Sequence, residues 1–280
     1  MGETALLIFS FCMQTAIGVM LFITLGKQLY KDKQFSRAAI ASAVLSVIGV
    51  VASLAHLGQP LSALNSLANF GSSWLSREVL FAGVFMGIAV LHALAQYYKQ
   101  DNLSLNTILR WAGSVVGIIT VFSMGKLYTM TSVPVWHGMN TFVDFYATTI
   151  AVGALIFLAI SLKELQNDDK RIFGFIILAA VILQASVAMP YAIGLSLNGM
   201  AAQASSEILS RMSTVIGLKW LLILGGAGLL IWPTIQKAGI KGDKSVSGII
   251  YVAGAALVCG QLIGRYIFYA AMIATSVGLT

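Results

Sequence analysis

A histidine and a carboxylate flank one loop of this chain, and both side chains can exchange protons near neutral pH. His56 ends a long apolar run in the stretch ASLAHLGQP, and Glu78 follows Ser76 and Arg77 in the stretch LSREVL. An imidazole has an ordinary pKa of about 6.5 and accepts protons at physiological pH. A positioned carboxylate can do the same. These residues are therefore a candidate site for a reaction that releases protons.

The stretch GQLIGRYIFY near the C-terminus adds a second polar group. Gln261, Arg265 and Tyr269 recur at every fourth residue, so they share one face of a helix. A guanidinium inside an apolar segment is costly and normally pairs within the protein. We expect Arg265 either to pair with a carboxylate or hold a loop, or to contribute to the candidate site. Gly260 and Gly264 form a small-xxx-small pattern, which favours close helix packing.

Each candidate also has a purely structural alternative. His56 would then be an interfacial ring bonded to a backbone carbonyl. Glu78 would complement the dipole of a helix that Ser76 caps. Three further charged side chains are expected at the membrane surface: Lys126, Lys219 and Asp144.

The composition places these residues in a membrane. Of the 280 residues, 58% are hydrophobic and only 10% are charged, and the mean hydropathy is +0.88. Soluble proteins carry about 25% charged residues. The net charge of +7 then reports orientation in the bilayer. No stretch interleaves basic and aromatic residues as a nucleic-acid surface does, so we expect no nucleic-acid partner.

Long uncharged segments predict an all-α integral membrane protein with eight transmembrane helices. Each segment has about the 20 residues that a helix needs to cross a bilayer, whereas a barrel strand needs about 10 alternating residues. The predicted spans lie near residues 5–26, 38–58, 78–98, 111–130, 141–162, 172–195, 213–232 and 248–273.

Basic residues are distributed unevenly over the connections and predict the orientation. The first, third, fifth and seventh connections hold twelve: Lys27, Lys31, Lys33, Arg37, Lys99, Arg110, Lys163, Lys170, Arg171, Lys237, Lys241 and Lys244. The other three connections hold Arg77, Lys126 and Arg211. The positive-inside rule puts the richer set in the cytoplasm, so both termini are expected on the extracytoplasmic side.

The N-terminus and a short repeat bear on domain organisation. The start MGETALLIF lacks a basic n-region, so the first apolar run is expected to be a retained helix. LSRE at 75–78 and LSRM at 209–212 each precede a span after an outward connection, which suggests two duplicated four-helix halves. We expect residues 1–280 to form a single polytopic membrane domain.

The chain offers few ligands for a redox centre of its own. Cys12 and Cys259 lie in separate apolar segments, and a zinc or iron–sulfur site needs about four ligands. His92 is expected toward the cytoplasmic end of its helix, whereas His56 and His137 lie outward. A single outer haem held by His56 and His137 is the one alternative; we predict neither haem nor an iron–sulfur cluster, and no metal site.

Quinol oxidation fits such a site. It releases two electrons and two protons, and His56 and Glu78 could accept the protons. The electrons must then leave through a redox centre on a partner.

Two blocks of the sequence resemble a known family. ASLAHLGQPLSALNSLANFGSSWLSREVL at 52–80 resembles the region around helices two and three of the membrane anchor subunits of dimethyl sulfoxide reductases. GQLIGRYIFYAAM at 260–272 is similar to the family's closing motif, and Glu3 followed by LLIF to its opening one. Eight spans and outward termini also agree with the family.

The resemblance implies a subunit of a three-part respiratory reductase in the bacterial inner membrane. Its partners would be an iron–sulfur electron-transfer subunit and a molybdopterin catalytic subunit, both on the extracytoplasmic face. This haem-free anchor would oxidise menaquinol, while the terminal reductase site lies on another subunit. His56 matches the family's quinol-site histidine and Glu78 its carboxylate, with Arg77 and Arg265 tuning the site or anchoring the partner. Gln261 stands where some relatives have glutamate, and we assign it no proton transfer.

Three alternatives stay open at the level of the sequence. An anchor of the polysulfide-reductase type would differ in partner and substrate. A small-solute transporter would use the suspected halves as moving parts, although transporters usually place ionisable residues near the midplane. A purely structural anchor would have quinol bound elsewhere.

Overall fold

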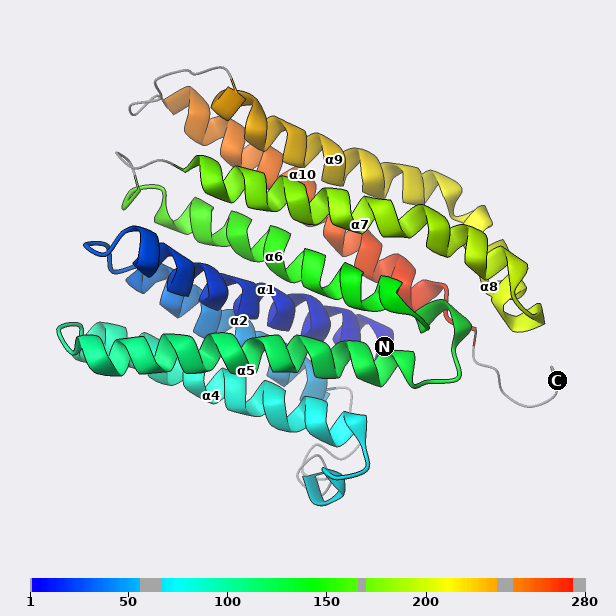
Figure 1. The fold of residues 1–280 in the computed structure, drawn as a ribbon, viewed down its shortest axis with the longest axis horizontal. Coiled ribbons are helices and arrows are strands. Elements are labelled where there is room, and N and C mark those ends of the chain that lie inside the picture. Colours follow the sequence, from blue (N-terminus) through cyan, green and yellow to red (C-terminus); the bar gives the residue numbers. More distant parts are fainter. Residues whose placement is uncertain (1, 56–66, 166–169, 236–243, 274–280) are drawn as a thin grey trace. The chain divides into compact units, whose positions relative to one another are not determined.

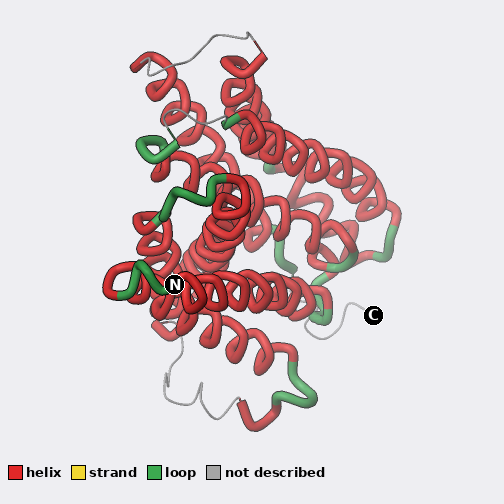
Figure 2. Tube along the Cα trace, turned by 60° about the vertical axis from the view of Figure 1, so that its left-hand side comes forward, coloured by secondary structure: helices red, strands yellow, loops and turns green. Residues whose placement is uncertain are grey.

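The computed structural model describes residues 2–55, 67–165, 170–235 and 244–273. Within these ranges the chain is helical, with connecting loops and no strand (Figure 2). The α-helices are α1 (Gly2–Leu29), α2 (Ser36–Ala55), α4 (Trp74–Tyr98), α5 (Leu103–Thr129), α6 (Met139–Ser161), α7 (Arg171–Leu197), α8 (Met200–Arg211), α9 (Ser213–Ile235) and α10 (Lys244–Ala270). Two short 3-10 helices are η2 (Leu67–Asn69) and η3 (Pro134–Trp136).

Eight helices of the described residues are long and apolar enough to cross a membrane, which confirms the predicted all-α, multi-span architecture. α8 was not predicted, because the stretch between the sixth and seventh spans has the mixed polarity of a loop. This helix has only 12 residues, and its sequence, MAAQASSEILSR, mixes polar with apolar side chains. It is too short to span a bilayer, which takes about 20 residues.

The chain divides into two compact units. Unit 1 comprises residues 1–124 and 149–170, and unit 2 comprises residues 125–148 and 171–280. A duplication into four-helix halves would put a boundary between α5 and α6 (Figure 1). The compact units instead divide both of these helices, and the duplication stays a prediction.

Unit 1 is held together by helices whose backbones touch. A Cβ atom on Gly18 of α1 would lie 2.0 Å from the carbonyl oxygen of Thr149 and 2.7 Å from Cα of Gly153, both in the second half of α6. α5 packs against α1 and α4, since a Cβ on Gly117 would lie 2.7 Å from Ile17 and 3.3 Å from Phe85. Glycine at these positions brings the helices closer than any side chain would allow.

In unit 2, glycines likewise allow α9 and α10 to pack closely. A Cβ on Gly260 would lie 2.7 Å from Ile223 and 3.0 Å from the carbonyl oxygen of Lys219. One on Gly226 would lie 2.7 Å from the carbonyl oxygen of Ala253. The small-xxx-small pattern of α10 therefore serves helix packing, as predicted.

Aromatic contacts fix the segment between α5 and α6 within unit 2. The Trp136 indole donates a hydrogen bond to the carbonyl oxygen of Phe268 (2.7 Å) and stacks on its ring at 5.4 Å between centroids. The hydroxyls of Tyr128 and Tyr269 lie 2.7 Å apart and share a hydrogen bond. Tryptophan and tyrosine both bury their rings here with their polar atoms satisfied.

Candidate functional site

The three histidines have different surroundings. His56 lies outside the described residues, which reach Ala55 at the end of α2. His92 is fully buried in α4, and neither of its ring nitrogens has a hydrogen-bond partner in the described part of the chain. His137 is exposed, and its Nε2 lies 2.5 Å from the carbonyl oxygen of Thr131. The predicted proton-accepting role of His56 thus stays a prediction.

Glu78 is buried inside α4. Its side chain is 4% exposed, and its Oε1 has no hydrogen-bond partner among the described residues. The helix begins at Trp74 with Ser73 as N-cap, whose hydroxyl accepts a hydrogen bond from the Ser76 amide (3.4 Å). The alternative in which Ser76 caps the helix and Glu78 complements its dipole is therefore wrong, since Glu78 lies beyond the first turn. Buried carboxylate oxygens normally accept hydrogen bonds, so Oε1 of Glu78 needs another partner, such as a ligand or water.

Arg77 binds the segment that precedes α4. Its guanidinium donates hydrogen bonds to the carbonyl oxygens of Phe70 (3.0 Å) and Gly71 (2.7 Å). Its Cζ also lies 4.3 Å from the centre of the Trp74 ring. Arg77 thus holds the end of the connection between α2 and α4 close to the start of the helix that carries Glu78.

Arg265 belongs to unit 2 and is 1% exposed. Its Nη2 lies 3.9 Å from Oδ2 of Asp144, and its Cζ lies 4.2 Å from the centre of the Phe145 ring. The expected pairing with a carboxylate inside the protein is confirmed. Glu78 belongs to unit 1, so a pocket shared by Glu78 and Arg265 stays a prediction.

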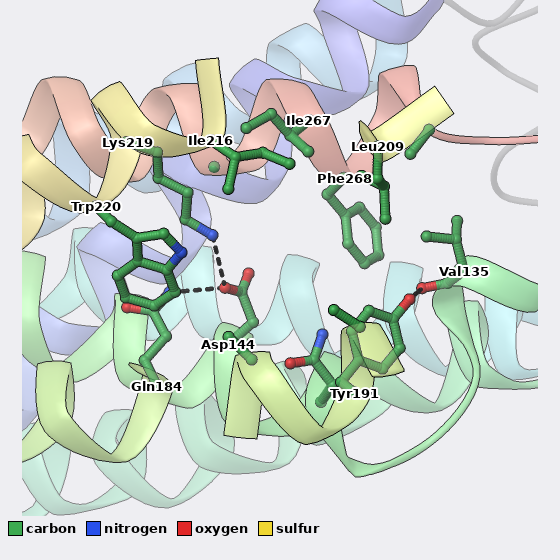
Figure 3. A pocket seen from close by; sticks show the side chains of 15 residues that line it. Val135, Asp144, Gln184, Tyr191, Leu209, Ile216, Lys219, Trp220, Ile267 and Phe268 are labelled. Carbon is green, nitrogen blue, oxygen red and sulfur yellow. Dashed lines mark hydrogen bonds and ion pairs between the residues drawn. The ribbon is translucent and has the colours of Figure 1, made fainter. Parts of the chain in front are cut away.

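Asp144 was expected at the membrane interface; its depth in a bilayer stays a prediction, but its side chain is largely buried within unit 2. Its side chain is only 14% exposed and accepts a hydrogen bond from Nε2 of Gln184 (2.6 Å). The Lys219 ammonium lies 3.9 Å from Oδ1 of Asp144 and is likewise 14% exposed, so Lys219 pairs internally rather than reaching for the surface. Gly264 makes room for this lysine, because a Cβ there would lie 2.8 Å from its Cε. Figure 3 shows Lys219 and Gln184 converging on Asp144.

A cavity of about 140 Å³ adjoins this cluster (Figure 3). Its walls are mostly apolar, with a few polar side chains. The lining residues are Val135, Asn140, Asp144, Gln184, Ala188, Tyr191, Ala192, Leu209, Ile216, Lys219, Trp220, Gly264, Ile267, Phe268 and Ala271. The Tyr191 hydroxyl donates a hydrogen bond to the carbonyl oxygen of Val135, which ties α7 to η3 at one side of the cavity.

One feature of the sequence indicates that Asp144 and Lys219 could pair. Asp144 lies five residues after the start of α6 at Met139, and Lys219 lies six residues after the start of α9 at Ser213. Both helices were predicted to begin on the outer side, so the two opposite charges had to lie at similar depth. Opposite charges at one depth in a bilayer are expected to pair.

No group of three or more histidine, cysteine, aspartate or glutamate side chains able to hold a metal ion occurs in the described part of the chain.

Comparison with known proteins agrees with the fold. The model of the family described as DMSO reductase anchor subunit (DmsC) matches residues 1–271. The C subunit of the anaerobic dimethyl sulfoxide reductase of Escherichia coli (strain K12) is 28% identical over 228 residues, which is 81% of this chain and 78% of that protein. The YnfH subunit of the same organism's anaerobic dimethyl sulfoxide reductase is 26% identical over 271 residues, 95% of this chain and 94% of that protein.

A third relative, the C subunit of the Haemophilus influenzae (strain Rd) anaerobic dimethyl sulfoxide reductase, is 29% identical over 170 residues, 59% of this chain and 61% of that protein. No solved structure matches this chain. The family match covers nearly the whole chain and supports a membrane anchor that associates with a reductase complex over a solute transporter. The chain belongs to the DMSO reductase anchor subunit (DmsC) family.

Proposed function

We propose that this protein oxidises menaquinol at the extracytoplasmic face of a bacterial cytoplasmic membrane and passes the electrons to an iron–sulfur partner subunit. The observation that carries the proposal is Glu78, a buried carboxylate with an open oxygen in a member of the reductase anchor family. A buried acceptor of this kind is what a quinol hydroxyl needs.

In the proposed reaction the quinol loses two protons and two electrons. One quinol hydroxyl donates a hydrogen bond to His56, which takes its proton, and the second hydroxyl gives its proton to Glu78. The two electrons leave to the nearest cluster of the iron–sulfur subunit, and a molybdopterin subunit uses them to reduce dimethyl sulfoxide or a similar acceptor. The quinol becomes a quinone, and both protons are released outward.

The two arginines take supporting roles in this proposal. Arg77 holds the carbonyl groups of Phe70 and Gly71 and so positions the segment in front of Glu78. Arg265 would tune the site or anchor the partner, as the resemblance implies, and within unit 2 Asp144 partly balances its charge. The protein itself would carry neither haem nor an iron–sulfur cluster.

The test is the binding of a hydroxyquinoline N-oxide, a quinol-site inhibitor, to membranes that contain the assembled complex. Fluorescence quenching gives its dissociation constant for wild type, His56→Ala and Glu78→Gln. We expect at least tenfold weaker binding in each variant, since a hydrogen bond to a charged group contributes about 1.5–3 kcal/mol. Menaquinol oxidation should fall with it.

Glu207→Gln is a matched control, because Glu207 is an exposed glutamate of α8 that pairs with Arg211. This variant should bind the inhibitor as wild type does. Wild-type binding and turnover in both His56→Ala and Glu78→Gln, with the complex intact, would show that the proposal is wrong.

A further inference from the structure

Two cations share one carboxylate in the interior of unit 2. Lys219 and Arg265 each lie 3.9 Å from an oxygen of Asp144. Direct N–H···O hydrogen bonds have donor–acceptor distances of about 2.7–3.2 Å, so neither contact is one. The Lys219 ammonium carries three donors, and besides Asp144 it faces the Trp220 ring, whose centre lies 4.9 Å away. The cluster therefore has hydrogen-bonding capacity left, on the side where Lys219 and Asp144 line the cavity.

The walls of this cavity suit an aromatic ring. Ile216, Ile267 and Leu209 supply apolar surface, and the rings of Trp220 and Phe268 also line the space (Figure 3). Mostly apolar walls with a few convergent polar groups are typical of small-molecule sites. The volume of about 140 Å³ is close to that of an engineered cavity of about 150 Å³ that binds benzene. The cavity therefore holds one ring of a fused pair, and the rest of the ligand would lie at its open side.

The depth of the polar groups suits a ligand that arrives from the bilayer. Asp144 and Lys219 lie five and six residues inside the starts of α6 and α9. At about 1.5 Å per residue, this places them roughly 8–9 Å from the helix ends. A ring that dissolves in the membrane would find the polar groups at this depth.

Other occupants fit less well. An anion would face the Asp144 carboxylate at the same wall. A proton relay from Asp144 through its hydrogen-bonded neighbour would meet the paired amides of Gln184 and Gln261, which bond each other at 2.8 and 3.2 Å. Neutral amides neither take up nor release protons near neutral pH. The remaining choice is a neutral ligand that offers an acceptor to Lys219 and a donor to Asp144, or water alone.

We propose that this cavity is a second quinone-binding site, lined by residues of unit 2 only. A ring oxygen accepts a hydrogen bond from the Lys219 ammonium, and in the quinol form a hydroxyl donates to Asp144. Gly264 is a positioning residue, because it leaves the space that the lysine side chain occupies. The choice of a quinone rests on the proposed function, which brings quinols to this protein.

The experiment counts sites for the same hydroxyquinoline N-oxide in membranes with the assembled complex. Ala188→Leu fills the cavity with hydrocarbon and leaves the ion pairs intact. Lys219→Met removes the proposed donor with little change in shape. We expect wild type to show two binding components, and each variant to lose one of them or bind it at least tenfold more weakly. Ala179→Leu is the matched control, since Ala179 is exposed on the same helix α7 and does not line the cavity.

Two outcomes distinguish the second quinone site from the proposed role of Glu78. If Ala188→Leu and Lys219→Met titrate as wild type while Glu78→Gln loses binding, the cavity holds only water and the second site is wrong. If Glu78→Gln titrates as wild type while Ala188→Leu loses binding, the second site stands and the proposed role of Glu78 fails. Because Ala188→Leu does not disturb the charges, the result does not depend on whether Lys219→Met folds.

Discussion

Gln184 and Gln261 pair their side-chain amides inside unit 2. Nε2 of Gln261 donates to Oε1 of Gln184 (2.8 Å), and Nε2 of Gln184 donates both back to Gln261 (3.2 Å) and to Asp144 (2.6 Å). Both glutamines are nearly fully buried, at 3% and 2% exposed. Thr148 adds a donor to Oε1 of Gln261 (3.0 Å). Buried amides of this kind stabilise a fold only while each remains paired.

Replacing one glutamine should therefore lower the free energy of unfolding by more than the loss of its own hydrogen bonds would. We expect Gln261→Leu to lower the free energy of unfolding of the solubilised complex by about 1–3 kcal/mol, because Gln184 keeps a buried oxygen without its donor. In the double variant with Gln184→Leu, the loss should be smaller than the sum by at least about 0.5 kcal/mol. Denaturant unfolding in detergent measures both.

Gln203→Leu is the control at this scale, because Gln203 is exposed on α8. A substitution there should change stability by no more than about 0.5 kcal/mol. Strictly additive losses in the double variant would contradict the pairing of the two amides.

The packing of α9 against α10 depends on glycines at the contact face. Gly226 and Gly225 are neighbours in α9, yet only Gly226 faces α10. A Cβ on Gly226 would lie 2.7 Å from the carbonyl oxygen of Ala253 and 2.9 Å from the amide of Leu257, whereas one on Gly225 would meet nothing within 4 Å. Backbone atoms cannot move aside as the end of a flexible side chain can.

We therefore expect a glycine-to-alanine substitution to change stability differently at these two neighbouring positions. Gly226→Ala should lower the stability of the solubilised complex by about 1–3 kcal/mol, the usual range for overpacking. Gly225→Ala should be neutral or stabilise by up to about 1 kcal/mol, since alanine restricts the unfolded chain. Thermal unfolding of both variants and of wild type measures these differences in stability. Equal effects of the two changes would rule out a close α9–α10 contact at Gly226.

At the scale of the whole molecule, the distribution of lysine and arginine predicts which side of the membrane each connection faces. The connection between α6 and α7 is basic, with Lys163, Lys170 and Arg171, whereas residues 198–199 between α7 and α8 carry no charge. The positive-inside rule places the first in the cytoplasm and the second outside. The proposed release of protons outward depends on this orientation.

Cysteine labelling in intact cells tests the orientation. We expect a membrane-impermeant maleimide to label Asn198→Cys and to leave Lys163→Cys unlabelled until the cells are permeabilised. The native thiols give little background, because Cys12 and Cys259 lie within candidate spans, Thr4–Leu29 and Gly248–Ala270. The reverse labelling pattern would invert the topology and put the proposed quinol site at the cytoplasmic face.

The sequence by itself determined the number, kind and order of the spans, because backbone groups in a membrane must be satisfied within helices or closed barrels. Uncharged segments of about 20 residues have the length of helices and are too long for barrel strands. The sequence also determined that Gly260 and Gly264 lie at a helix contact and that Arg265 needs a partner. It did not reveal α8, because a short segment of mixed polarity resembles a loop. The candidate residues Arg77, Glu78 and Arg265 were found by their chemistry and by motif, and their role with His56 stays a prediction.

Only the tertiary structure decided which charges meet. Asp144, Gln184, Lys219 and Arg265 come from α6, α7, α9 and α10, and their contacts are set by how these helices pack in unit 2. Depth along a helix can be read from residue number, but the direction in which a side chain faces depends on the neighbouring helix. Hydropathy says nothing about that choice, since lipid and helix surfaces are equally apolar. The cavity beside Asp144 therefore came into view only with the packed helices.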